Sequence, residues 1–292
     1  MVKLSVAIIV KNESSEILEC LESVNGADEI VIVDTGSTDD TCTLIEAYNG
    51  DNVVLVKDEY VWQDDFAHAR NYANNICTGD WILTISADGR MTNINSVMML
   101  IDDLEDSVDA ISITQQSRYG NTHKRTMLHK RMSDVRWQGA VHENLAMATH
   151  TQNEPDIIMR YGYSESHKFD PDRNLRILLK DSGSARTSYY LGVEFFERKQ
   201  FQTAVLWFTE CSRTSTFIAE RADAWLYIAK CRWKMSEGDA AREAAAKAII
   251  NNPNFKEAHL KMAEMVWDKQ KVKWQQFANL ATNEDVLFVR NT

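Results

Sequence analysis

The sequence lacks the features that mark several classes of protein. Its five cysteines are scattered and form no CxxC pair, which predicts reduced, mostly buried thiols rather than a disulfide framework or a zinc site. No apolar run reaches the roughly 18 residues that a membrane-spanning helix needs. The chain enters a strand-like segment at once, without a charged-then-apolar leader. We therefore expect no secretion, no membrane span and a cytoplasmic location.

Glycine-rich phosphate loops are also missing. Glycines spaced as in the dinucleotide fingerprint are absent, which argues against a nicotinamide-dependent enzyme. A nucleotidyltransferase would share a parallel sheet and carboxylates. It usually has an early glycine-rich loop bearing Lys or Arg, and Lys11-Asn12-Glu13 is not such a loop.

Basic residues are scarce in the first part of the chain. Up to Ile177 there are 15 Lys and Arg against 29 Asp and Glu, whereas the remainder has 17 against 14, which together give the net charge of -11. This balance argues against binding to nucleic acid or an anionic membrane. Residues 118–136 are the exception, since Asp134 is their only acid. By themselves they predict a solvated hairpin with charged edges. An anionic ligand nearby would give these basic residues a binding role, so a nucleic-acid acceptor is not excluded.

Apolar segments alternate in a way that predicts an α/β domain. Buried strands are expected at residues 4–10, 29–33, 53–56 and 81–85, separated by helices at 17–24, 42–48 and 64–77. A helix at 93–104 and a strand at 110–115 follow. This order predicts βαβ units and a mostly parallel, Rossmann-like sheet.

Beyond about Arg173 the alternation stops and the pattern is all helix. Small and aromatic residues align in three segments with a period near 34 residues, typical of tetratricopeptide repeats. A plain helical bundle is the alternative. We therefore predict an α/β domain over residues 1–178 and a tetratricopeptide-like domain over 179–292. We expect its last segment, with Trp267, Trp274 and Phe277, to cap the stack or to contact a partner, either a second copy of the chain in a homodimer or another protein.

Two carboxylates follow buried strands. Asp34 precedes Thr35-Gly36-Ser37-Thr38-Asp39, and Asp88 ends Ser86-Ala87-Asp88. The carboxyl ends of parallel strands are where ligands bind in open α/β sheets, and the following helix N-termini favour anions. The alternative for Asp88 is a turn residue that only caps backbone amides. In the other motif, a plain helix cap would explain Ser37 and Asp39.

Several ordered motifs share one resemblance. They are Ile9-Val10-Lys11-Asn12-Glu13, Val33-Asp34-Thr35-Gly36-Ser37-Thr38-Asp39, Trp62-Gln63-Asp64-Asp65-Phe66-Ala67-His68-Ala69-Arg70-Asn71, Thr78-Gly79-Asp80-Trp81 and Trp137-Gln138-Gly139-Ala140-Val141-His142-Glu143. Together they resemble the family-2 inverting glycosyltransferases with the GT-A fold, in the branch that appends tetratricopeptide-type helices. Members of that branch act on peptides or on cell-envelope saccharides.

The resemblance implies a set of donor-binding residues. Asp34 would recognise the uracil of a UDP-sugar, Lys11 and Glu13 would line the nucleotide, and Arg70 would face the same side. In the family an Asp-x-Asp signature contacts the ribose and holds a divalent cation (Mn or Mg) on the diphosphate. Ser86 replaces its first Asp here, and Asp88 keeps the metal-binding position.

A second departure concerns the metal. The family often has a His before a strand end such as Tyr161-Gly162-Tyr163, where this chain has Arg160. Arg cannot ligate a cation, but a guanidinium can itself neutralise a diphosphate. One hypothesis is that Arg160 takes over the work of the metal. The alternative is that Arg160 points away and that His167 or water completes the metal shell.

The same resemblance places the acceptor chemistry at His142 and Glu143. Glu143 is the predicted base that deprotonates the acceptor, and His142 is the second candidate. The predicted function is inverting transfer of a sugar from a UDP-sugar to a peptide, lipid, saccharide or modified nucleobase. The alternative is a catalytically degenerate nucleotide-sugar or protein-binding module that acts through its helical repeats. Ser86 and Arg160 favour that alternative, whereas Asp34, Arg70, Asp88 and Glu143 oppose it.

Overall fold

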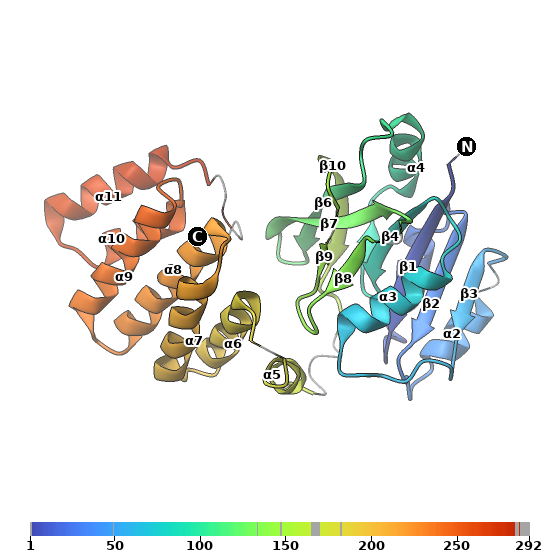
Figure 1. The fold of residues 1–292 in the computed structure, drawn as a ribbon, viewed down its shortest axis with the longest axis horizontal. Helices are drawn as coiled ribbons and strands as arrows, with labels where there is room; N and C mark the ends of the chain where they lie inside the picture. The colour runs from blue at the N-terminus through green and yellow to red at the C-terminus, as the bar shows by residue number, and fades with distance from the viewer. Residues whose placement is uncertain are drawn as a thin grey trace. The chain divides into compact units, whose positions relative to one another are not determined.

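The computed structural model divides the chain into two compact units, Met1–Pro171 and Asp172–Thr292 (Figure 1). It describes residues 2–48, 50–132, 134–146, 148–164, 170–181, 183–283 and 286. The predicted domain boundary after residue 178 falls at the end of helix α5 (Arg173–Leu178), which the structure assigns to the second unit. Among the described helices, none combines the length and the hydrophobicity that crossing a membrane requires.

The first unit is built on an eight-stranded sheet of order β3-β2-β1-β4-β7-β6-β10-β5. Its first four strands are mutually parallel: β3 (Val53–Val56), β2 (Glu29–Asp34), β1 (Leu4–Val10) and β4 (Trp81–Ser86). They lie where the continuous apolar runs predict them. Almost every side chain of β1 and β4 is buried, because helices pack on the sheet there.

The other half of the sheet mixes directions. β7 (Thr122–Lys130) runs antiparallel to both β4 and β6 (Ala110–Ser117), while β10 (Thr151–Tyr161) runs parallel to β6 and antiparallel to the short β5 (Arg90–Met91). A separate two-stranded sheet joins β8 (Arg136–Gln138) and β9 (Asn144–Ala146).

The predicted hairpin with charged, solvated edges was wrong in one respect. Its second strand, β7, lies inside the sheet between β4 and β6 rather than at an edge. Met127, Leu128 and His129 are buried there, because the strand has neighbours on both sides.

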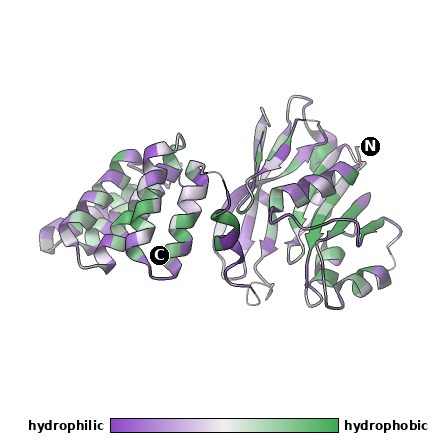
Figure 2. Ribbon diagram, turned by 60° about the horizontal axis from the view of Figure 1, so that its bottom comes forward, coloured by the Kyte–Doolittle hydropathy of each residue, from purple (hydrophilic) through white to green (hydrophobic). Residues whose placement is uncertain are grey.

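Helices cover both faces of the parallel half of the sheet. Helix α3 (Phe66–Ile76) packs Ala69 and Ala73 against one face, while α1 (Ile17–Ser23) and α4 (Ile94–Asp103) pack on the main core of the unit. Helix α2 (Thr41–Ala47) follows β2. Asp65 and Asn93 cap α3 and α4 by accepting the amides of His68 and Ser96. Figure 2 shows hydrophobic residues concentrated along the strands of this unit.

The second unit is all helix. After α5 it contains the antiparallel pairs α6 (Ala185–Glu197) with α7 (Phe201–Thr214), α8 (Ile218–Lys234) with α9 (Gly238–Asn251), and α10 (Lys256–Glu264) with α11 (Asp268–Leu280). Small residues let the pairs approach closely: a Cβ on Gly192 would lie 2.7 Å from the ring of Phe208. The structure confirms the predicted fold class, because an α/β domain with a mostly parallel sheet is followed by an all-helical unit built of helix pairs.

Candidate functional site

The loops that follow β1 and β2 are joined to each other at the carboxyl edge of the sheet. The amide of Asn12 donates to Ser37 Oγ (3.0 Å), and the amide of Thr38 donates to Asn12 Oδ1 (2.7 Å). The amide of Glu13 donates to Thr41 Oγ1 at 2.8 Å. Asn12 adopts φ 55°, a left-handed conformation that Asn tolerates better than most residues. These bonds hold the two loops together, and each loop carries predicted donor-binding residues.

Asp34 ends β2 with a buried carboxylate. It accepts the amides of Gly36 and Ser37 at 3.1 Å, and Gly36 adopts φ 104°, which glycine permits. The hydrogen bonds of the Asp34 carboxylate in this structure are therefore to backbone amides. A carboxylate has about four acceptor positions, so capacity remains for a ligand N–H.

Asp88 and Glu13 converge on the segment that follows β10. Asp88 Oδ2 accepts the amides of Gly162 (2.9 Å), Tyr163 (3.1 Å) and Ser164 (3.3 Å). The hydroxyl of Ser164 donates to Glu13 Oε1 at 2.7 Å. The structure thus links Asp88 and Glu13, two predicted donor-binding residues, through the segment after β10. One carboxylate oxygen of Asp88 is occupied by backbone amides.

A buried cluster of three charges lies at the end of β4. Glu143 Oε1 accepts from Arg70 Nε at 2.6 Å and from Arg125 Nη2 at 2.9 Å. Arg125 also donates to the main-chain oxygen of Glu143 (2.7 Å), and Arg70 Nη1 donates to the carbonyl of Ile85 (3.4 Å). The ring of Trp137 lies 5.4 Å from each guanidinium carbon. We call these residues, Arg70, Glu143 and Arg125, the Arg-Glu-Arg cluster.

The electrostatics of the cluster favour a charged Glu143. Burial alone would raise the pKa of Glu143, but Arg70 and Arg125 outweigh it and lower that pKa to about 2. Two guanidinium groups and one carboxylate leave the cluster with one net positive charge. Arg70 and Glu143 are 5% and 6% exposed, whereas the side chain of Arg125 is 26% exposed. Arg125 is therefore the member best able to reach a ligand.

His123 stands beside the cluster on β7. Its ring packs edge-on against Tyr161, with ring centres 5.8 Å apart. Burial lowers the pKa of His123 to about 4, and Arg125 contributes in the same direction. The imidazole is therefore neutral near pH 7.

Arg160 lies on β10 with an exposed side chain. Its neighbour Met159 is fully buried, and Tyr161 lies close enough to Asp88 and Arg125 for both to affect its pKa, which burial chiefly raises. Since successive side chains of a strand point to opposite faces, Arg160 points away from Tyr161. Both readings of Arg160, a role in place of the metal and a side chain that points away from the donor, stay predictions. His167 lies outside the described residues.

Of the remaining predicted residues, Lys11 and His142 lie in loops and Ser86 ends β4. Lys11 is exposed after β1, and the carbonyl of Ser86 accepts the amide of Gly89 in the turn after β4. His142 is half-buried with φ 54°, directly before Glu143.

No feature of the sequence singled out Arg125. It is one of six basic residues in the stretch 118–136, and its role depends on β7 being an interior strand. The available signal was the alternation of His123, Arg125 and Met127, whose side chains share one face of such a strand.

The described residues do not fit a divalent cation. No three His, Cys, Asp or Glu of the described ranges gather to hold a metal. Ser86 offers no second carboxylate beside Asp88, and Asp88 Oδ2 already accepts three amides.

Comparison with known proteins decides the family. The family model described as glycosyl transferase family 2 matches residues 5–166, more than half of the chain. The chain belongs to glycosyl transferase family 2. The match contains every residue of the site described above.

Relatives of this family-2 chain include longer proteins. It is 30% identical over 185 residues to a TPR repeat-containing protein of Synechococcus elongatus, covering 56% of this chain and 43% of the relative. It is 33% identical over 147 residues to the glycosyltransferase SunS of Bacillus subtilis, covering 47% and 33%. The chain thus spans less than half the length of these relatives. Among solved structures, S. aureus TarS in complex with UDP-GlcNAc is 14% identical over 99% of both chains, with a TM-score of 0.49.

Proposed function

We propose that this protein transfers a sugar from a UDP-sugar to an acceptor with inversion of configuration. The observation that supports this most is the Arg-Glu-Arg cluster, a fixed cationic group at the end of β4. Membership of glycosyl transferase family 2 supports sugar transfer as the reaction class. The UDP donor and the inversion rest on the family resemblance of the sequence motifs.

The donor would bind along the edge formed by the loops after β1, β2 and β4. Asp34 would accept the uracil N–H, with Lys11 and Glu13 lining the nucleotide. Ser86 and the second oxygen of Asp88 would bind ribose hydroxyls. The hydrogen bonds that join the first two loops support this assignment, because they fix the binding groups before the ligand arrives.

Arg70 and Arg125 would stabilise the leaving diphosphate. Negative charge grows on a phosphate oxygen as the bond to the sugar breaks, and preorganised cations lower the energy of that state. Of the guanidinium nitrogens of Arg125, only Nη2 is hydrogen-bonded to Glu143. The other N–H groups of Arg125 are therefore directed elsewhere. A planar guanidinium suits two phosphate oxygens. Arg125 thus takes the role that the sequence suggested for Arg160.

Glu143 would position the two arginines rather than accept a proton. A base works best with a pKa near the operating pH, and the pKa of Glu143 is about 2. His142 is then the candidate base. The acceptor oxygen would lose its proton to His142 and attack the anomeric carbon from the face opposite UDP. The bond from that carbon to the phosphate oxygen would break, and its electron pair would leave with UDP.

A binding module without catalysis is the second candidate. Ser86 in place of an acidic residue favours it, as does the lack of a metal-binding cluster among the described residues. A UDP-release assay with a panel of UDP-sugars distinguishes a transferase from a binding module. A transferase releases UDP with at least one sugar, faster when an acceptor is present, and the product has inverted anomeric configuration by NMR. Binding of UDP-sugars without turnover under any acceptor condition would leave only the binding module.

A further inference from the structure

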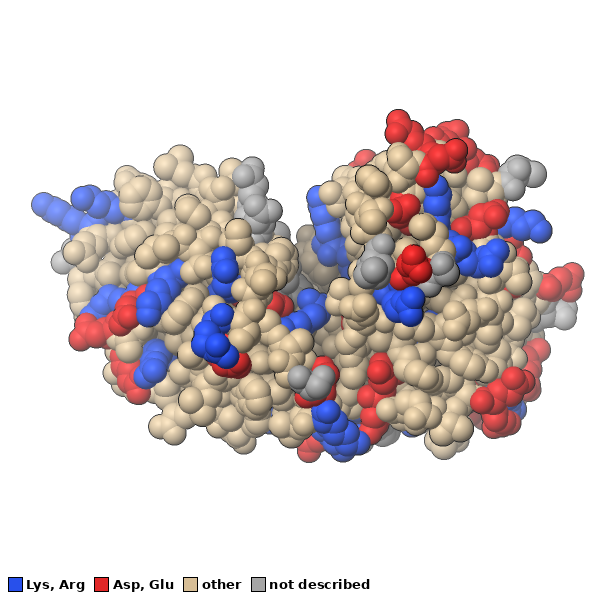
Figure 3. All heavy atoms as spheres, in the orientation of Figure 1, with Lys and Arg blue, Asp and Glu red and all other residues tan. Residues whose placement is uncertain are grey.

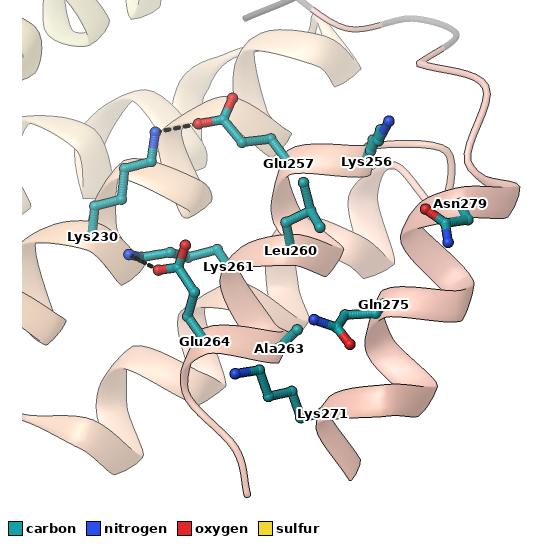
Figure 4. Close-up of a pocket in the computed structure, with 10 residues that line it drawn as sticks. All are labelled: Lys230, Lys256, Glu257, Leu260, Lys261, Ala263, Glu264, Lys271, Gln275 and Asn279. Atoms are coloured by element: carbon teal, nitrogen blue, oxygen red, sulfur yellow. Dashed lines mark hydrogen bonds and ion pairs between the residues drawn. The ribbon is translucent and has the colours of Figure 1, made fainter. Parts of the chain in front are cut away.

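The helical unit contains a groove lined by lysines from three helices. Its volume is about 610 Å³, and α8, α10 and α11 form its walls (Figure 4). Four lysines line it, namely Lys230, Lys256, Lys261 and Lys271. We call this cavity the lysine groove. It lies in the second unit, and no residue of the site described above takes part in it.

The lysine groove has a positive charge excess. Lys230 pairs with Glu257 at 2.5 Å, and Lys261 pairs with Glu264 at 2.6 Å. Within the described ranges, no carboxylate forms an ion pair with the side chain of Lys256 or Lys271. Two ammonium groups are therefore available to a ligand, on α10 and on α11. The whole unit has the same bias, with 19 Lys and Arg against 15 Asp and Glu, while residues 1–171 have 13 against 28. Figure 3 shows one face of the molecule, on which acidic side chains predominate over the first unit.

Neutral groups complete the walls. Figure 4 shows Gln275 and Lys271 extending from α11 towards α10, with Leu260 and Ala263 between the charged residues and Asn279 further along α11. Side-chain amides both donate and accept, as a peptide main chain requires. Leu260 and Ala263 offer an apolar surface on which an extended segment can lie.

We propose that the lysine groove binds an acidic peptide segment of a partner protein. Its volume is too large for one carboxylate or phosphate and falls within the usual range for bound organic ligands. The ammonium groups of Lys256 and Lys271 match two carboxylates of the segment. Because Glu257 and Glu264 stand among the four lysines, the groove suits a segment with separated charges and neutral groups better than a polyphosphate or nucleic acid, whose negative charges are dense. The proposal does not depend on sugar transfer.

The test is fluorescence anisotropy of the full chain with a labelled nonapeptide of alternating acidic and small residues. The same peptide with Asn and Gln in place of the acids is the neutral comparison. Lys256→Glu and Lys271→Glu should each weaken binding roughly tenfold or more, because each reverses a charge that faces the ligand. Lys273→Glu is the matched control, since Lys273 lies on α11, is exposed and does not line the groove. It should change binding little.

Four results would overturn the proposal. Equal weakening by Lys273→Glu would show attraction to the general charge of the unit. Equal affinity for the neutral peptide, or no binding of the acidic one, would remove the acidic segment as ligand. Displacement by short polyphosphate at much lower concentration than by unlabelled peptide would identify a phosphate site. Self-association in sedimentation experiments that Lys256→Glu and Lys271→Glu abolish would make a second copy the occupant.

Discussion

At the scale of single residues, the site is organised by Glu143. Its carboxylate lies between Arg70 and Arg125, and the hydrogen bonds of 2.6 and 2.9 Å hold both guanidinium groups in place. Removing one partner from such a buried pair leaves an uncompensated charge, which typically costs about 3–5 kcal/mol of stability. Functional variants of this cluster therefore need to conserve charge.

Arg125→Lys is the most informative such variant. It keeps the positive charge but loses the planar guanidinium, so we expect turnover with a UDP-sugar to fall roughly 10- to 100-fold. Lys124→Gln is the matched control, because Lys124 is exposed on the same strand and its side chain points to the other face. Steady-state kinetics of both variants measure the change in turnover, and their denaturant midpoints measure the change in stability. A loss of turnover that the midpoint fully explains would show that Arg125 is only structural.

His123 makes the stability of the protein depend on pH. Its pKa is lowered from 6.5 to about 4 in the fold, so the unfolded chain binds more protons between these values. Stability should therefore rise with pH from about 4 to 6.5. His123→Asn should flatten that rise, although His129, whose pKa burial also lowers, contributes in the same direction.

Urea midpoints measured between pH 4 and 7 would test this prediction. His150→Asn serves as the control, since the side chain of His150 is 69% exposed. An unchanged slope in His123→Asn would mean that His123 binds its proton in the folded state as readily as in the unfolded chain.

Asp34, Asp88, Arg70 and Glu143 show how far single residues could be identified from the sequence. Each lies in a contiguous motif, and the structure places all four at strand ends or in the buried cluster. Arg125 could not be identified, because its role depends on a contact across 18 residues that no local pattern encodes. The role of Arg160 stays a prediction, since the sequence does not show which way its side chain points.

At the scale of elements, continuous apolar runs predicted the four parallel strands within a residue. β10 was not predicted, and β7 was predicted only as part of a solvated hairpin, because the sequences of both strands are rich in charged and polar residues. They join the sheet because each finds hydrogen-bonding neighbours on both sides, a tertiary effect that outweighs their composition. The helix ends differ by one or two residues, where capping decides the boundary.

Gly192 tests the packing of the first helix pair. A Cβ at this position would lie 2.7 Å from the ring of Phe208, which is fully buried and stacked on Tyr227. Because that ring cannot move freely, we expect Gly192→Ala to destabilise the helical unit by about 1–3 kcal/mol in chemical denaturation. Gly238→Ala is the control, since its Cβ would meet nothing closer than 3.5 Å. Equal stability of the two variants would contradict close packing at Gly192.

At the scale of the whole molecule, an acidic family-2 unit is joined to a helical unit with a slight positive excess. Family-2 membership rests on residues 5–166, and thus on the first unit alone. The helical unit contributes the lysine groove, whose ligand the chemistry of the first unit does not determine. The matches to this chain cover 43% of the Synechococcus elongatus relative and 33% of SunS, so most of each relative lies outside the matched region.

The central claim is that a UDP-sugar binds at the carboxyl edge of the sheet with Arg125 as a cationic partner of its diphosphate. Calorimetric titration of UDP and UDP-sugars, each with manganese and with EDTA, tests it most directly. We predict binding that persists in EDTA and weakens about tenfold or more in Arg125→Lys, while Lys124→Gln is unaffected. Binding that requires manganese and is indifferent to Arg125 would contradict the claim.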